Sequence, residues 1–74
     1  MRVLQTLTEL NWKVLSNMHS NEGMSFILFE KNNCRLHYWE NENTVEVYRN
    51  KECIFEGHID DVEDFLIIER LLRV

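Results

Sequence analysis

The stretch from Ser25 to Glu40, SFILFEKNNCRLHYWE, decides the fold of this 74-residue chain. Apolar and polar residues alternate after Asn32-Asn33, as is typical of a strand, and before it the run from Phe26 to Phe29 is apolar on both faces of a strand. Two adjacent asparagines favour a tight turn, because Asn accepts left-handed backbone angles. The stretch therefore predicts two antiparallel strands, Ser25 to Glu30 and Arg35 to Glu40, joined as a hairpin.

The position of the turn fixes the register of this hairpin. A two-residue loop at Asn32-Asn33 sets Ile27 opposite Tyr38 and Phe29 opposite Leu36. It also sets Glu30 opposite Arg35, an ion pair on the other side of the sheet. Apolar residues thus face apolar residues, which supports the predicted register.

Two further turns extend the sheet in the same way. A loop at Asn41-Glu42 places Tyr38 opposite Val45 and Leu36 opposite Val47. A loop at Asn50-Lys51 places Val47 opposite Ile54, and Arg49 opposite Glu52. These turns predict a meander in which each strand pairs with the next.

The segment from Trp12 to Met18 has two interpretations. Trp12, Val14 and Met18 share even-numbered positions, and the Asn-Glu-Gly at 21 to 23 is a hairpin signal, which favours a strand. Val14, Leu15 and Met18 would instead prolong the preceding helix. We expect a strand.

A helix is predicted at each end of the chain. Apolar residues at helical spacing indicate a helix over Arg2 to Leu10, with Val3, Leu4, Leu7 and Leu10 on one side, and Asn11 ends it in the left-handed conformation. Asp60 is predicted to cap the second helix, with Glu63 at the third helical position. The apolar arc of that helix is wider than one sheet face needs; it comprises Val62, Phe65, Leu66, Ile67, Ile68, Leu71 and Leu72.

The predicted registers separate the sheet into two faces. The core face comprises Trp12, Val14, Met18, Ile27, Phe29, Cys34, Leu36, Tyr38, Val45, Val47 and Ile54. The second face comprises Phe26, Leu28, Arg35, His37, Trp39, Thr44, Glu46, Tyr48, Cys53 and Phe55. We expect both helices to cover the core face, which leaves the second face available to a partner.

Composition bounds the protein class. Seventy-four residues make a single domain, spanning 1–74. A domain of this size is near the lower limit at which a hydrophobic core alone stabilises the fold, and because association buries further surface, a homodimer is expected. The net charge of −5 repels nucleic-acid backbones, so we expect no direct nucleic-acid binding. No apolar run is long enough for a membrane span or a signal peptide, so we expect no membrane association and a cytoplasmic protein.

Motifs of catalysis and metal binding are absent from the sequence. No phosphate loop, dinucleotide fingerprint, nucleophile elbow or paired-Cys zinc spacing occurs, so we expect no enzyme and no cofactor. Cys34 and His37 form a Cys-x-x-His pair, but residues three apart on a strand point to opposite faces, so no metal site is expected. Cys53 lies on the face opposite Cys34, so no disulfide is expected either, and both cysteines are expected to be small core residues.

These observations favour an α+β domain: an N-terminal helix, an antiparallel meander of four to five strands and a C-terminal helix. Its expected function is protein interaction, including self-association through the second face or the C-terminal helix. The predicted partner-binding residues are Phe26, Leu28, His37, Trp39, Tyr48 and Phe55. The alternative is an acidic inhibitor that mimics nucleic acid on another protein's binding site. A short, acidic, proline-free domain with no catalytic motif resembles accessory proteins of phages and mobile elements.

Overall fold

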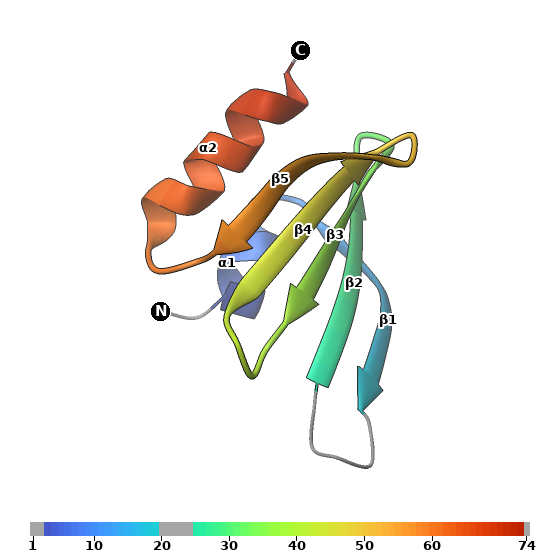
Figure 1. Cartoon of the computed structure of the whole chain (residues 1–74), viewed down its shortest axis with the longest axis vertical. Coiled ribbons are helices and arrows are strands. Elements are labelled where there is room, and N and C mark those ends of the chain that lie inside the picture. Colours follow the sequence, from blue (N-terminus) through green and yellow to red (C-terminus); the bar gives the residue numbers. More distant parts are fainter. Residues whose placement is uncertain (1–2, 20–24, 74) are drawn as a thin grey trace.

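The computed structural model describes residues 3–19 and 25–73 of the chain and confirms the predicted α+β class (Figure 1). A five-stranded sheet lies between two helices in the sequence. The elements are α1 (Val3–Glu9), β1 (Lys13–His19), β2 (Ser25–Lys31), β3 (Cys34–Trp39), β4 (Thr44–Arg49), β5 (Glu52–His58) and α2 (Val62–Leu72).

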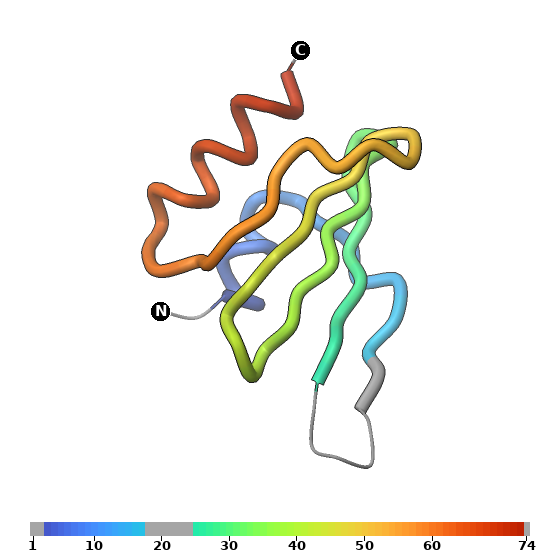
Figure 2. Tube along the Cα trace, in the orientation of Figure 1, coloured from blue at the N-terminus to red at the C-terminus, as the bar shows by residue number. Residues whose placement is uncertain are grey.

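The sheet is an antiparallel meander in the order β1-β2-β3-β4-β5. Figure 2 traces the chain up and down through neighbouring strands in sequence order. Between β2 and β3 the register is the predicted one, with Phe29 opposite Leu36. Between β3 and β4 it is also the predicted one, with Tyr38 opposite Val45.

Left-handed asparagines make the turns that set these registers. Asn32 and Asn33 both have positive φ angles, of 49° and 65°, as a two-residue hairpin requires. The β4–β5 turn repeats this arrangement at Asn50 and Lys51, with φ angles of 50° and 71°. Lys51 is the unusual member, because a lysine has no side-chain feature that favours positive φ.

The predicted register of β5 is wrong beyond its first residues. Arg49 pairs with Glu52 as expected, but Val47 pairs with Phe55 rather than with Ile54. A bulge between these pairs inserts one extra residue into β5, which moves each later residue to the other face. Ile54 and Phe55 consequently both pack, partly buried, against the core.

The segment after Trp12 is a strand, as predicted, but it too is irregular. The register shifts between Val14 and Ser16, so that Ser16 pairs with Leu28 and Met18 with Phe26 rather than continuing the core-face alternation. Val14 was expected in the core, but its side chain is 50% exposed because β1 is an edge strand with neighbours on one side only. The side chain of Met18 and the Asn-Glu-Gly signal at 21 to 23 lie outside the described residues.

Helix α1 ends as predicted at Asn11, whose φ is 71°. The amide of Asn11 donates to the carbonyl of Thr8, and the amide of Trp12 donates to the carbonyl of Leu7. This pair of bonds is a Schellman motif, closed by the buried side chains of Leu7 and Trp12. Leu4, expected on the apolar side of the helix, is 43% exposed.

The cap of α2 lies one residue later than predicted. Asp61, not Asp60, is the N-cap, and its side chain accepts from the amide of Glu63 at 2.9 Å. Asp64, not Glu63, occupies the third helical position and accepts from the amides of Asp60 and Asp61 at 2.8 and 3.1 Å. The shorter Asp side chain at this position completes the capping box.

One core holds both helices on the same face of the sheet, as predicted. Val3 and Leu7 of α1 and Phe65, Ile68 and Leu72 of α2 join the core face of the strands. The strand and connecting residues of this core are Trp12, Ile27, Phe29, Cys34, Leu36, Tyr38, Val45, Val47 and Ile59.

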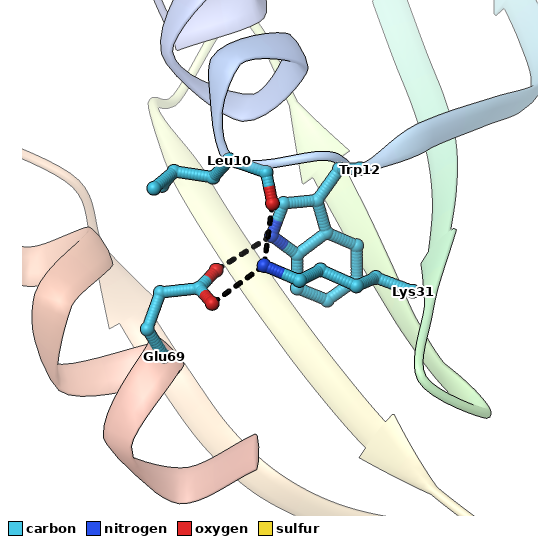
Figure 3. A network of polar contacts seen from close by, with 4 residues as sticks. All are labelled: Leu10, Trp12, Lys31 and Glu69. Atoms are coloured by element: carbon cyan, nitrogen blue, oxygen red, sulfur yellow. Dashed lines mark hydrogen bonds and ion pairs between the residues drawn. The ribbon is translucent and has the colours of Figure 1, made fainter. Parts of the chain in front are cut away.

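A polar network closes the core at one side (Figure 3). Glu69 of α2 accepts from the indole nitrogen of Trp12 at 3.0 Å and pairs with the ammonium of Lys31 at 2.6 Å. The same ammonium donates to the carbonyl of Leu10. Segments from both ends of the chain and from β2 are thereby tied together.

Candidate protein-binding face

The second face of the sheet lies opposite the side that carries both helices (Figure 1). Within the described residues no helix covers it. The register shows which side chains of neighbouring strands lie side by side on this face: Phe26 pairs with Trp39, Leu28 pairs with His37, and His37 pairs with Glu46. All five of these side chains are partly exposed. The face is therefore a continuous surface over β2, β3 and β4.

Aromatic rings contact one another across these three strands. The ring centroids of Phe26 and Trp39 lie 4.5 Å apart. Phe26 meets His37 edge-on at 5.3 Å, and His37 lies 5.0 Å from Tyr48. Edge-on and tilted contacts of this kind stabilise aromatic pairs beyond the area that they bury. The rings thus form a preorganised cluster of fixed shape.

Glu46 lies within this cluster and is held by two of its members. One carboxylate oxygen accepts from the indole nitrogen of Trp39 at 3.3 Å, and the other accepts from the hydroxyl of Tyr48 at 2.9 Å. The bond to Glu46 is the main reason that the pKa of Tyr48 is raised, and partial burial adds to it. The cluster therefore holds a carboxylate in a defined position on the sheet.

Further carboxylates gather beside Trp39. Glu46 and Glu56 are direct cross-strand partners on β4 and β5, where like charges oppose each other. Both line an open hollow with Glu42 and Trp39, and His58 and Thr44 border it as well. A hollow of this composition attracts a cation, because a positive group relieves the repulsion and can lie against the indole ring.

The structure places five of the six predicted partner-binding residues on the second face: Phe26, Leu28, His37, Trp39 and Tyr48. Leu28 borders the ring cluster on β2. Phe55 is the exception, because the β5 bulge pairs it with Val47 and packs it against the core. Glu56 takes a position on the second face in its place, which the simple alternation of β5 did not indicate.

Other kinds of site find less support in the described residues. Cys34 is buried in the core and His37 lies on the second face, so the Cys-x-x-His pair is split as expected. Cys53 lies opposite Tyr48 on the second face, where the predicted registers placed it, but it is an exposed free thiol and not a small core residue. No group of three or more His, Cys, Asp or Glu in residues 3–19 and 25–73 is arranged to hold a metal ion. None of the helices described has the length and apolar character needed to cross a membrane.

Comparisons with protein-family models, with curated proteins and with solved structures find no match. The geometry of the second face is therefore the basis for assigning a function. Both edge strands carry bulges, which disfavour the addition of a partner strand. The second face, rather than an edge of the sheet, is the surface that best suits recognition of another molecule.

Proposed function

We propose that this protein is a small non-enzymatic protein-interaction module whose second face binds a partner protein. The partner segment that fits this face carries Lys or Arg beside apolar side chains. The observation that supports this most directly is the position of Glu46, which is held by Trp39 and Tyr48 and opposed by Glu56. Aromatic rings supply the contact area, and the carboxylates supply the charge that selects a basic segment.

The hollow lined by Trp39, Glu42, Glu46 and Glu56 is better suited to a cation of a different protein than to a cation of a second copy of this chain. Arg35 lies on the same face, but its Nε is 3.7 Å from the carboxylate of Glu30. Two copies of this face would also bring the carboxylates of Glu30, Glu46 and Glu56 near the same three of the other copy, with Arg35 as the compensating base, which is repulsive. We therefore assign the second face to a different protein.

The test uses a random peptide library displayed on phage and selected against the immobilised protein. We expect the enriched peptides to contain Lys or Arg next to aromatic or aliphatic residues. Trp39→Ala should weaken their binding by about 2 kcal/mol, or about 30-fold, because an aromatic residue at the centre of a binding surface is a typical hot spot. Glu46→Gln should weaken basic peptides selectively, and Leu4→Ala on α1 is the matched surface control.

Two outcomes would contradict the proposal. Enriched peptides without basic residues would remove the role of the carboxylates. Peptides that bind Trp39→Ala as tightly as the parent would locate the binding surface elsewhere. Circular dichroism of each variant verifies that the fold is retained.

A second candidate is the acidic inhibitor that occupies a nucleic-acid-binding site. It is supported by the three carboxylates that line one hollow, Glu42, Glu46 and Glu56, in a chain of net charge −5. Salt separates the two functions. A mimic that replaces phosphates loses most of its affinity as salt rises and is little affected by Trp39→Ala. The proposed face loses only the part of its affinity that the carboxylates supply, and it loses the rest in Trp39→Ala.

A further inference from the structure

Helix α2 has a second apolar side that the core does not use. Phe65, Ile68 and Leu72 are buried, whereas Leu66 and Ile67 are each 46% exposed. Val62 at the start of the helix is 53% exposed. Figure 1 shows α2 along one flank of the sheet, beside β5. Single exposed apolar residues are common on protein surfaces, but three on one side of an 11-residue helix form a stripe.

Two charged residues frame this stripe. Residues four apart lie one above the other on a helix, so Val62, Leu66 and Arg70 form one row, and Glu63 and Ile67 form the row beside it. Glu63, Leu66, Ile67 and Arg70 line a common hollow on the surface. The acid lies toward the N-terminal end of the stripe and the base toward its C-terminal end.

We propose that this stripe, defined as Val62, Glu63, Leu66, Ile67 and Arg70, is the surface through which two copies of the chain form an antiparallel dimer. If a two-fold axis passes between Leu66 and Ile67, Leu66 of each copy packs against Ile67 of the other. The same axis places Glu63 of one copy against Arg70 of the second. The stripe thus matches itself in its apolar centre and in its charges, as a two-fold interface requires.

The antiparallel direction is the one that the charges select. A parallel pair would bring Glu63 against its own copy and Arg70 against its own copy, which is repulsive at both ends. Because α2 spans only about 16 Å, the interface is small, and we expect a dissociation constant in the micromolar range or weaker.

The experiment measures self-association by sedimentation equilibrium from low micromolar to millimolar concentration. We expect the parent to dimerise and Ile67→Lys to weaken the dimer by about tenfold or more, because it places charge in the apolar centre. Leu4→Lys, at a comparably exposed leucine on α1, is the matched control and should leave the dimer intact. A parent that stays monomeric throughout, or two lysine variants that behave alike, would overturn the proposal.

Charge reversals test the geometry itself. Glu63→Arg and Arg70→Glu should each weaken the dimer by about three- to tenfold, and the double variant should restore it. Equimolar mixing of the two single variants should produce a heterodimer stronger than either homodimer, because each Arg then meets a Glu of the other copy. A change in the stability of one helix cannot produce this result.

A double variant as weak as the singles would exclude the antiparallel pairing. Trp39→Ala should leave this dimer unchanged, and Ile67→Lys should leave peptide binding unchanged. Failure of the dimer proposal can therefore be distinguished from failure of the proposed peptide binding by the second face.

Discussion

The ammonium of Lys31 lies 2.6 Å from the carboxylate of Glu69, although 38 residues separate them in the chain. Both side chains are mostly shielded, with exposed fractions of 15% and 16%. The carboxylate also accepts from the indole of Trp12, whose ring lies 5.9 Å from the ammonium. This arrangement fixes α2 against the start of β1, and no pattern along the sequence indicates it.

Glu69→Gln should destabilise the protein by about 1–3 kcal/mol, because it removes the charge that compensates the shielded ammonium of Lys31. The matched control is Glu30→Gln in the exposed pair with Arg35, which should cost no more than about 0.5 kcal/mol. Urea unfolding followed by circular dichroism measures both. Equal losses for the two variants would mean that the Lys31–Glu69 pair has no special role.

Phe29→Ala and Leu36→Ala should each destabilise the protein by about 2–5 kcal/mol, because both side chains are fully buried and face each other in the core. A domain of this size has on the order of 5 kcal/mol of stability, so either variant can be largely unfolded. Leu4→Ala, at an exposed leucine, should change the unfolding free energy by about 0.5 kcal/mol or less. Thermal melting measures all three variants, and melting temperatures of Phe29→Ala and Leu36→Ala equal to that of the parent would refute the assignment of faces.

The central hairpins could be predicted from the sequence because their signals are local. Asn32-Asn33 fixes the turn, and the turn fixes every pair between β2 and β3. The register between β3 and β4 was also predicted correctly, although the turn predicted at Asn41-Glu42 is a four-residue connection, 40–43, in which Asn43 has the positive φ, of 52°. Each prediction needs only the turn residues and the alternation beside them.

The two bulges could not be predicted in this way. The extra residue in β5 leaves no distinctive residue type, since Cys53, Ile54 and Phe55 all suit a regular strand. Only the packing of Ile54 and Phe55 against the core favours it. The bulge replaces Phe55 by Glu56 on the second face, so part of the candidate site depends on tertiary structure alone.

Lys51→Gly should stabilise the protein by about 1 kcal/mol. The backbone of Lys51 has a φ of 71°, which costs an L-residue with a side chain about 1–2 kcal/mol and costs glycine little. Glycine also adds entropy to the unfolded chain, which reduces the gain. Asn50→Gly is the control and should gain less, because Asn already tolerates its φ of 50°. The urea concentrations at the midpoint of unfolding are compared for the parent and both variants. A Lys51→Gly variant less stable than the parent would contradict the positive φ at this turn.

Asp64→Asn should reduce stability at neutral pH and lose this effect in acid. The pKa of Asp64 lies below its usual value of 3.8 because its carboxylate accepts the amides of Asp60 and Asp61. A lowered folded-state pKa adds stability that is fully present above the unfolded value and disappears as the pH falls through the folded one. The difference in unfolding free energy between parent and variant should therefore shrink below pH 3.8. A difference that stays constant with pH would contradict the capping box.

Glu46→Gln should lower the pKa of Tyr48 toward the ordinary tyrosine value of 10.0, because the hydrogen bond to a charged carboxylate is the largest cause of its rise. Tyr38 provides an internal control. Its pKa is raised mainly by burial, with the charge of Glu40 adding to it, and its hydroxyl donates to Asn43 at 3.0 Å, away from Glu46. Alkaline titration followed by the ring resonances of the two tyrosines in NMR spectra distinguishes them. If Tyr48 titrated identically in parent and variant, the carboxylate of Glu46 would not be held within the aromatic cluster, and the charge that we assign to partner selection would lose its fixed position.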